Sequence, residues 1–168
     1  MKKKLSPTVF LAQAAMIAAL YIVLTFIANA LGLANYAIQV RFSEALTILP
    51  YFTPAAIPGL FAGCLLSNIL TGCMPLDDVI FGSLATLVGA FGTYALRKHK
   101  WLAPLPPIIA NIIVVPLVLS YVYQFEGSLP YFALTVGIGE FISCGILGMI
   151  VLNALQKHAG KIFQGIYK

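Results

Sequence analysis

The chain has 168 residues, of which 61% are hydrophobic and only 9% are charged, and its net charge at pH 7 is +5. Soluble domains carry about 25% charged residues, so this composition excludes a soluble globular protein and predicts an integral membrane protein. A spanning helix needs about 20 apolar residues, which limits the chain to at most about six or seven spans. No stretch is long and polar enough for a soluble domain, and we expect one transmembrane domain over residues 1–168.

The positive charge is placed as membrane topology requires. Nine of the ten Lys and Arg residues fall in three clusters, at Lys2–Lys4, Arg97–Lys100 and Lys157–Lys168. Cytoplasmic segments of membrane proteins are enriched in Lys and Arg. We therefore expect both termini in the cytoplasm, and the charge does not require a nucleic-acid partner.

The first predicted helix covers about residues 8–30 and begins on the cytoplasmic side. Its apolar run is too long for the core of a secretory signal, so we expect it to be retained, although Ala28–Ala30 mimics a cleavage site. Two overlapping AxxxA patterns lie near its inner end, formed by Ala14, Ala15, Ala18 and Ala19. Small residues four apart allow helices to approach closely in lipid. They pack either within this chain or against another membrane protein, and the sequence leaves both open.

Residues 31–42 are expected outside, and a short second helix over about residues 43–52 returns inward. The stretch 36–59 holds Arg41, with Glu44 three residues later, and three prolines interrupt it. In lipid, irregular backbone is tolerated only where protein or a water-filled cavity satisfies its polar groups, and broken helices often border a solute site. We interpret this stretch as the lid or floor of a binding cavity. Glu44 also suits a helix N-terminus, where a carboxylate stabilises the helix dipole.

The remaining helices are expected to alternate across the membrane. They are predicted at about residues 58–70, 79–96, 104–123 and 130–156. Glycines along the third and fourth helices predict close packing, and Pro116 is expected to kink the fifth. The predicted fold class is an all-α membrane protein with six transmembrane helices, a short second helix and both termini cytoplasmic.

Glu140 is the most informative single residue. It lies about ten residues into the sixth predicted helix, so roughly 15 Å along its axis. A carboxylate at that depth is costly and by default functional, although a hydrogen bond to a neighbouring helix is the structural alternative. Gly137, Glu140, Cys144 and Gly148 share one face of the predicted helix, which is lined by small residues and could border a cavity.

The polar residues of the predicted spans and turns are biased toward the outer half of the membrane. They are Arg41, Glu44, Asn68, Asp77, Asp78, Asn111 and Glu140. Their acids outnumber the base four to one, which favours a solute that is cationic or rich in N–H donors. The asparagines could equally bridge helices, and capping of a helix accounts for at least one aspartate. Aromatic residues that could stack on a planar ring are Tyr36, Phe42, Tyr51, Phe132 and Phe141, although aromatics near interfaces are usually anchors.

Catalytic and metal-binding arrangements are poorly supported. His99 and His158 lie in basic cytoplasmic segments far from the acids, and the chain has no HExxH, GxSxG or GxxxxGK[ST] motif. Cys64, Cys73 and Cys144 are widely spaced, which predicts neither a disulfide framework nor a zinc site. We expect no enzymatic activity, no metal and no cofactor, so active transport would draw its energy from an ion gradient or a partner.

Two sequence segments, together with features of the first and sixth predicted helices, resemble those of a known family of transporters. The segments are IQVRFSEALTILPYFTPAAIPGLFAGCLLSN and PLDDVIFGSLATLVGA, which accompany the AxxxA helix and the glutamate of the sixth helix. Over essentially its whole length the chain resembles the queuosine-precursor transporters of the QueT type. These are substrate-binding (S) components of energy-coupling factor (ECF) transporters.

The resemblance implies a six-helix subunit in the cytoplasmic membrane of a prokaryote, with a binding site near the outer face capped by the loop after the first helix. The implied partners are a transmembrane coupling subunit, which docks on the AxxxA face, and two cytosolic ATPases that use ATP. The binder is expected to topple in the bilayer to release its solute inside. The implied substrate is a 7-deazaguanine, either queuine or a precursor such as 7-aminomethyl-7-deazaguanine.

For such a base, Glu140 is expected to accept the N–H and NH2 of the guanine-like edge. Asn68 or Asn111 would meet the ring carbonyl and nitrogens. An aminomethyl ammonium would favour one of the three other acids, Asp77, Asp78 or Glu44. The alternatives on the sequence are an S component for another flat nitrogenous vitamin, a proton-coupled small carrier that titrates Glu140, and a structural or accessory subunit.

Overall fold

The computed structural model describes residues 6–33, 39–72, 76–124 and 126–163, without the side chains at 77 and 78. Within these ranges the chain is helical and forms no strand. The elements are α1 (Pro7–Ala30), η1 (Phe42–Tyr51), α2 (Ala56–Leu70), α3 (Leu76–Ala95), η2 (Lys100–Leu102), α4 (Leu105–Leu117), η3 (Val118–Val122), α5 (Leu129–Glu140), η4 (Phe141–Leu147), α6 (Gly148–Gln156) and α7 (Ala159–Ile162).

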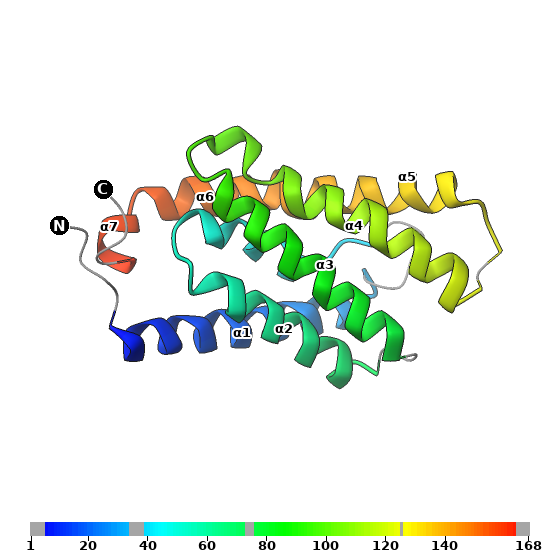
Figure 1. The fold of residues 1–168 in the computed structure, drawn as a ribbon, viewed down its shortest axis with the longest axis horizontal. Coiled ribbons are helices and arrows are strands. Elements are labelled where there is room, and N and C mark those ends of the chain that lie inside the picture. Colours follow the sequence, from blue (N-terminus) through cyan, green and yellow to red (C-terminus); the bar gives the residue numbers. More distant parts are fainter. Residues whose placement is uncertain (1–5, 34–38, 73–75, 125, 164–168) are drawn as a thin grey trace.

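The long helices lie lengthwise, side by side, in an elongated bundle (Figure 1). Helices that follow one another in the chain pack together, α1 on α2, α2 on α3, α3 on α4 and α4 on α5. The short helix η1 fills the interior and contacts α1, α2, α3, η4 and α6. The start of α1 and the helix α7 lie at the same end of the bundle (Figure 1). Six crossings with both termini in the cytoplasm remain a prediction.

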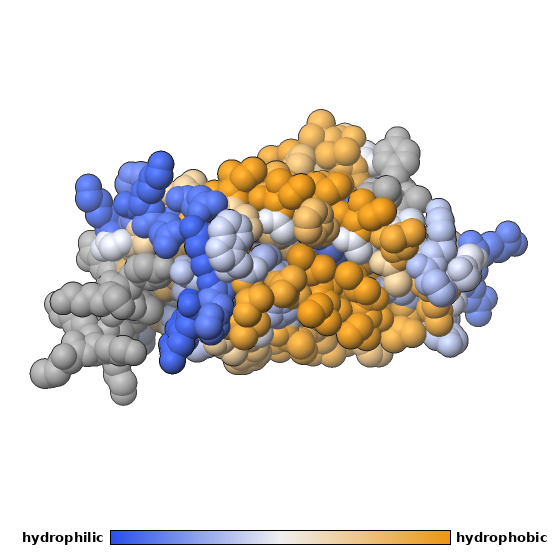
Figure 2. Space-filling view, turned by 90° about the horizontal axis from the view of Figure 1, so that it is seen from above, coloured by the Kyte–Doolittle hydropathy of each residue, from blue (hydrophilic) through white to orange (hydrophobic). Residues whose placement is uncertain are grey.

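Length and surface fit a membrane environment. Three helical stretches are long and apolar enough to span a bilayer: Pro7–Ala30, Lys100–Val122 and Leu129–Gln156. Two shorter apolar helices accompany them, Ala56–Leu70 and Val79–Ala95. On the face that Figure 2 shows, hydrophobic residues cover the middle of the molecule and hydrophilic residues gather at its two ends. Since the described residues form helices and no strand, the all-α part of the predicted fold class is confirmed.

The second predicted helix differs in kind from the prediction. Residues 42–51 form a 3₁₀-helix rather than a short α-helix, and all residues from Ser43 to Pro50 are buried. Pro50 lies inside this element, where an α-helix would lose a hydrogen bond and meet the proline ring. Since 3₁₀ runs beyond three or four residues are uncommon, we attribute the length of η1 to the packing around it on all sides.

The seam between α1 and α2 explains half of the AxxxA pattern. A Cβ at Gly59 would lie 2.7 Å from the Ala14 carbonyl oxygen, and a Cβ at Gly63 would lie 3.1 Å from the Ala18 Cα. Ala14 and Ala18 are accordingly buried. Backbones that approach this closely stabilise helix pairs in lipid through van der Waals contact. One AxxxA pattern of α1 therefore packs within the chain.

The sixth predicted helix is continuous from Leu129 to Gln156, as expected, but it is not uniformly α-helical. A π-helical segment, η4, begins directly after Glu140. A second π-helical segment, η3, follows Pro116 of α4. The wider π turns change which residues share a face, and such segments are frequent at functional sites. Gly148 nevertheless faces η1, as Cys144 does: an added Cβ would lie 3.6 Å from the Ala45 carbonyl oxygen, and Thr47 Oγ1 lies 3.3 Å from the Cys144 sulfur.

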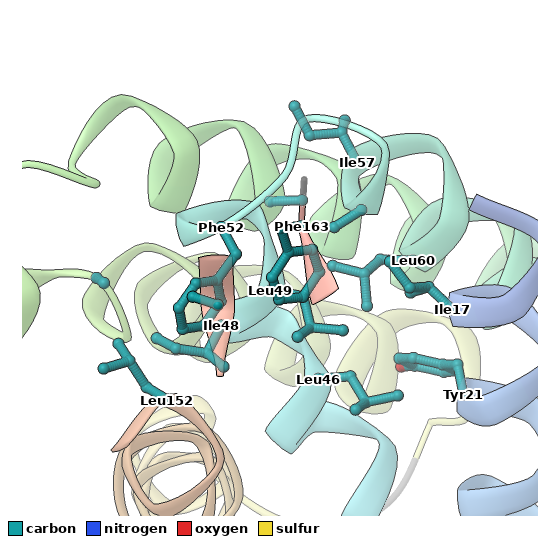
Figure 3. Close-up of a cluster of buried hydrophobic side chains, with 14 of the residues drawn as sticks. Ile17, Tyr21, Leu46, Ile48, Leu49, Phe52, Ile57, Leu60, Leu152 and Phe163 are labelled. Carbon is teal, nitrogen blue, oxygen red and sulfur yellow. The ribbon is translucent and has the colours of Figure 1, made fainter. Parts of the chain in front are cut away.

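A cluster of buried side chains lies around η1 (Figure 3). It includes Ala159 of α7 and the following Phe163. The rings of Phe52 and Phe163 stack with 5.2 Å between their centroids. Lipid tails are as apolar as these side chains, so close packing rather than exclusion of water is what holds the cluster together. Tyr21 of α1 belongs to the same cluster.

Candidate functional site

Five helical elements and the segment before η1 enclose a polar cavity. Its volume is about 30 Å³, which is room for about two water molecules. The lining residues are Gln39, Arg41, Glu44, Cys64, Gly82, Thr86, Asn111, Val115, Val136 and Glu140. The structure thus brings together four of the residues that the sequence predicted for a binding site: Arg41, Glu44, Asn111 and Glu140.

Two carboxylates face each other in this cavity. An oxygen of Glu44, an oxygen of Glu140 and the Cys144 sulfur all lie within 4.8 Å of one another. Arg41 is the one positively charged side chain among the lining residues. Like charges repel strongly in surroundings of low dielectric constant. The lining therefore holds two acidic side chains and one basic side chain, which favours a ligand with cationic or N–H donor groups.

Glu140 is held by short-range contacts from two elements. The Cys144 thiol donates to Glu140 Oε2 at 3.1 Å, and the Asn111 side chain also hydrogen-bonds this carboxylate. Thr47 Oγ1 of η1 lies 3.3 Å from the Cys144 sulfur. Cys144 lies one turn further along the same continuous helix and Asn111 belongs to α4, so contacts from two directions fix where the Glu140 carboxylate points.

Glu44 has a different environment for each of its oxygens. The Tyr21 hydroxyl donates to Oε1, whereas Oε2 is buried and has no hydrogen-bond partner among the residues that the structure describes. Leaving a buried polar atom unpaired costs about 1–3 kcal/mol, and such atoms in native proteins call for an explanation. Glu44 is only 2% exposed and is one of the residues that line the cavity, so a ligand bound there is a candidate partner for Oε2.

The segment before η1 forms one wall of the cavity. The Arg41 backbone N–H donates to Ser143 Oγ at 3.2 Å, and Arg41 Nη2 donates to the Gln39 side-chain oxygen at 3.4 Å. A Cβ at Gly139 would collide with the Gln39 carbonyl oxygen. Glycine at position 139 therefore allows this segment to lie directly on α5.

Asn68 is buried but does not line the cavity. Its side-chain amide donates to the Cys64 sulfur at 3.6 Å, and Thr86 Oγ1 donates to the same sulfur at 3.4 Å. Cys64 and Cys144 are buried free thiols, as the sequence predicted for cysteines outside disulfide frameworks. Asn68 thus reaches the cavity only through Cys64.

The aromatic candidates lie elsewhere. Four of the aromatic residues proposed to stack on a ring are described by the structure, and none of them lines the cavity: Phe42, Tyr51, Phe132 and Phe141. Phe141 is 61% exposed, and as the residue next to Glu140 it lies on another face of the helix. Tyr36 lies outside the described residues. Asp77 and Asp78 belong to the first turn of α3, and their side chains lie outside the description.

The four alanines of α1 divide into two pairs. Ala14 and Ala18 are buried against α2, whereas Ala15 and Ala19 are exposed. The outward pair is thus free to meet another protein or lipid.

Tyr21, Gln39, Gly82 and Thr86 take part in the site, although the sequence reasoning did not single them out. Gly82 and Thr86 are four residues apart, so their spacing alone predicts that they share one face of α3. Tyr21 follows Ala18 by three residues, and this places it on the face of α1 that meets α2.

Comparison with known proteins decides the family. The QueT transporter family matches residues 11–157 of the chain. The chain belongs to the QueT transporter family. It is also 36% identical over 167 residues to the Queuosine precursor transporter QueT of Lactococcus lactis subsp. cremoris (strain MG1363), a match that covers 92% of this chain and 96% of that relative. No solved structure matches.

Membership of the QueT transporter family confirms the resemblance drawn from the sequence. A transporter family and several long apolar helices together identify a multi-pass membrane protein. The polar cavity enclosed by its helices is the candidate binding site of this QueT family member.

Proposed function

We propose that the chain is the substrate-binding membrane subunit of an ATP-driven ECF-type importer in a prokaryotic cytoplasmic membrane. It captures a 7-deazaguanine queuosine precursor, queuine or 7-aminomethyl-7-deazaguanine, from outside the cell. The observation that carries this proposal is the pair Glu44 and Glu140 in one cavity with the Asn111 amide. The name of the relative from Lactococcus lactis, a queuosine precursor transporter, supports the substrate class.

The donor and acceptor pattern of the cavity suits such a base. A guanine-like edge offers an N–H and an NH2 group, which the Glu140 carboxylate can accept together. The Asn111 amide both donates and accepts, so it suits the ring carbonyl and nitrogens. Glu44 Oε2, which no described residue pairs, suits the ammonium of an aminomethyl group. A buried site built for hydrogen bonds rejects analogues that lack those groups, because its own polar atoms would stay unpaired.

The cavity has to widen before a base fits. Ligand pockets measure about 300–1,000 Å³, whereas the present cavity measures about 30 Å³. The wall formed by Gln39 and Arg41 is the one without helical hydrogen bonds of its own, and it is attached to η4 through Ser143. We propose that ligand entry displaces this described segment from α5.

The partner is proposed to dock on the outward side of α1. Ala15 and Ala19 are exposed there. An apolar groove of about 500 Å³ runs beside them between α1, η1, α6 and α7, lined by Gln13, Met16, Ile17, Leu20, Leu46, Leu49, Val151, Ala154, Leu155, Ile162 and Phe163. These features support docking of an apolar helix from a coupling subunit. The ATP would be hydrolysed by two cytosolic ATPases, since the chain has no phosphate-binding GxxxxGK[ST] loop.

A proton-coupled carrier is the second candidate, favoured by the closeness of Glu44 and Glu140 in a membrane protein. Ionisable residues within spans often belong to proton relays. Proteoliposomes that hold the purified chain alone separate the two. The carrier would take up substrate when a proton gradient is imposed, whereas the binding subunit would take up none without its ATPase partners.

The main test is a binding panel on the purified protein. Thermal-shift measurements with 7-deazaguanines and with flat nitrogenous vitamins identify the ligand, and calorimetry gives its Kd. Glu140→Gln keeps the shape of the side chain but loses the charge, and a hydrogen bond to a charged group contributes about 1.5–3 kcal/mol. We expect about 10- to 100-fold weaker binding. Glu126→Gln, at an exposed turn position, is the matched control and should bind as the unaltered protein does.

Unchanged affinity of Glu140→Gln would remove the central role of this acid, and the absence of any stabilising 7-deazaguanine would refute the substrate class. A vitamin that binds instead would redirect the assignment. The binding measurements are repeated with a metal chelator, because Glu44, Glu140 and Cys144 are close enough to ligate a metal ion. We expect binding to persist in its presence.

A further inference from the structure

We propose that Tyr21 is a positioning residue of the binding site: its hydroxyl holds one oxygen of Glu44 so that the other is presented to a cationic group of the ligand. This inference rests on the proposed function, because it assigns Glu44 a ligand contact. It goes beyond that function by linking the site to α1, the helix proposed to meet the partner.

The geometry places Tyr21 behind Glu44 rather than in the cavity. Tyr21 is 1% exposed and is absent from the cavity lining, whereas Glu44 belongs to it. The Tyr21 hydroxyl donates to Glu44 Oε1 and leaves Oε2 without a partner in the described part of the chain. Tyr21 can therefore influence a ligand only through Glu44 or through Cys64, the other cavity residue that its hydroxyl contacts.

The tyrosine itself is held firmly. A Cβ at Gly63 would lie 2.7 Å from the Tyr21 Cβ, so α2 closes directly on the base of the side chain. Thr25 Oγ1 donates to the Tyr21 carbonyl oxygen at 2.9 Å, one turn further along α1. Figure 3 shows the ring extending from α1 toward Leu46 of η1, within the buried cluster. A donor fixed in this way restricts the rotation of the carboxylate that it binds.

Charge explains why Glu44 needs such a partner. Arg41 lies three residues earlier and lines the same cavity, so it attracts the Glu44 carboxylate. A carboxylate released from Tyr21 is free to turn both oxygens toward Arg41, and it would then present neither to the ligand. The hydrogen bond from Tyr21 thus keeps one acceptor of Glu44 available to the ligand.

Tyr21→Phe tests the inference because it removes one hydroxyl and retains the ring. Two probes are compared, 7-aminomethyl-7-deazaguanine, which carries an ammonium, and 7-deazaguanine, which lacks it. We expect about tenfold weaker binding of the aminomethyl compound, in line with loss of one charged hydrogen bond, and little change for 7-deazaguanine. Tyr94→Phe, whose ring lies under Arg97, is the control and should alter neither affinity.

A double-mutant cycle with Glu44→Gln shows through which residue Tyr21 acts. If Tyr21 acts through Glu44, Tyr21→Phe should cause no further loss in the Glu44→Gln background, since interacting residues are not additive. Equal losses for both probes, or additive losses in the cycle, would overturn the inference. An unaltered protein that binds neither probe would instead contradict the proposed function.

A ligand-free measurement keeps the inference testable in that case. The infrared difference between the unaltered protein and Glu44→Gln identifies the carboxyl band of Glu44. That band should shift in Tyr21→Phe and stay in place in Tyr94→Phe. Gly63→Ala supplies a second variant, because its Cβ displaces Tyr21 and leaves the hydroxyl intact, and it should shift the same band. A band unmoved in both variants overturns the inference.

Discussion

The carbonyl oxygen of Gln39 lies so close to the α-carbon of Gly139 that position 139 has no room for a Cβ. This relationship joins the segment before η1 to α5 one residue before Glu140. The same segment is anchored to η4 by the hydrogen bond between Arg41 and Ser143. Two contacts thus close the polar cavity from this side, and each can be altered singly.

Gly139→Ala should loosen that wall. The added methyl group meets backbone rather than a flexible side chain, so the Gln39–Arg41 segment has to move, and overpacking of this kind costs about 1–3 kcal/mol. We expect a lower thermal midpoint and about tenfold weaker binding of the identified ligand, because Arg41 no longer lines the cavity. Stopped-flow dissociation should show the loss mainly as faster release.

The control for this variant is Gly160→Ala in α7, where an added Cβ has open space around it. It should leave both the midpoint and the affinity unchanged. If Gly139→Ala binds and melts as the unaltered protein does, the contact with Gln39 has no part in closing the cavity.

Asn111 and Asn68 should respond differently to the same substitution. Asn111→Leu removes a hydrogen bond to Glu140 inside the cavity, so we expect at least about tenfold weaker binding. Asn68→Leu removes only a contact with the Cys64 sulfur, and it should mainly lower stability, by about 1 kcal/mol. Paired calorimetry and thermal denaturation check both. Equal losses of affinity would show that Asn68 contacts the ligand directly.

Much of this site was predictable because membrane burial makes polar residues conspicuous. Arg41, Glu44, Asn111 and Glu140 are costly in lipid unless they serve a cavity, and the structure brings all four to one cavity. The long helices followed from the lengths of apolar runs. These predictions rest on strong local signals that need no knowledge of neighbouring helices.

The remainder depends on contacts between helices. Asn68 meets Cys64 one turn earlier on the same helix, but the rotation of α2 decides that Cys64 and not Asn68 lines the cavity, and no local pattern sets that angle. No local pattern marks the π-helical segment after Glu140, although it leaves Cys144 and Gly148 both facing η1. The role of Tyr21 arises from a hydrogen bond between residues distant in sequence, and its ring alone resembles any buried aromatic.

Filling the cavity should block binding without altering any polar group. Val136 lines the cavity and is buried, and Val136→Phe adds more volume than the present 30 Å³ can accept. We expect binding to become undetectable by calorimetry, with a stability cost of about 1–3 kcal/mol. Val88→Phe, at a position 64% exposed on α3, controls for the added ring. Retained affinity in Val136→Phe would place the ligand site elsewhere.

Substitutions on the two faces of α1 should have different effects: those on the buried face should lower stability, and those on the exposed face should impair coupling to the partner. Ala14 packs on Gly59, with 2.7 Å between the Ala14 carbonyl oxygen and a Cβ built on that glycine. Ala14→Leu should therefore force α1 and α2 apart, at a cost of about 1–3 kcal/mol, and lower the thermal midpoint. Ala15 is exposed, so Ala15→Leu should leave the midpoint and the ligand Kd unchanged while it reduces ATP-dependent uptake by cells that hold the whole transporter.

Ala15→Leu is informative beside Ala14→Leu because the two variants make the same substitution at neighbouring positions of α1, one exposed and one buried. A bulky side chain at a small-residue interface prevents close approach of a partner helix in lipid, whereas toward lipid alone it is neutral. Co-purification of the coupling subunit with Ala15→Leu and with Ala19→Leu measures the interface directly. Full uptake and full co-purification in both variants would show that the partner docks on another face of the bundle, and the groove beside α1 would then face lipid.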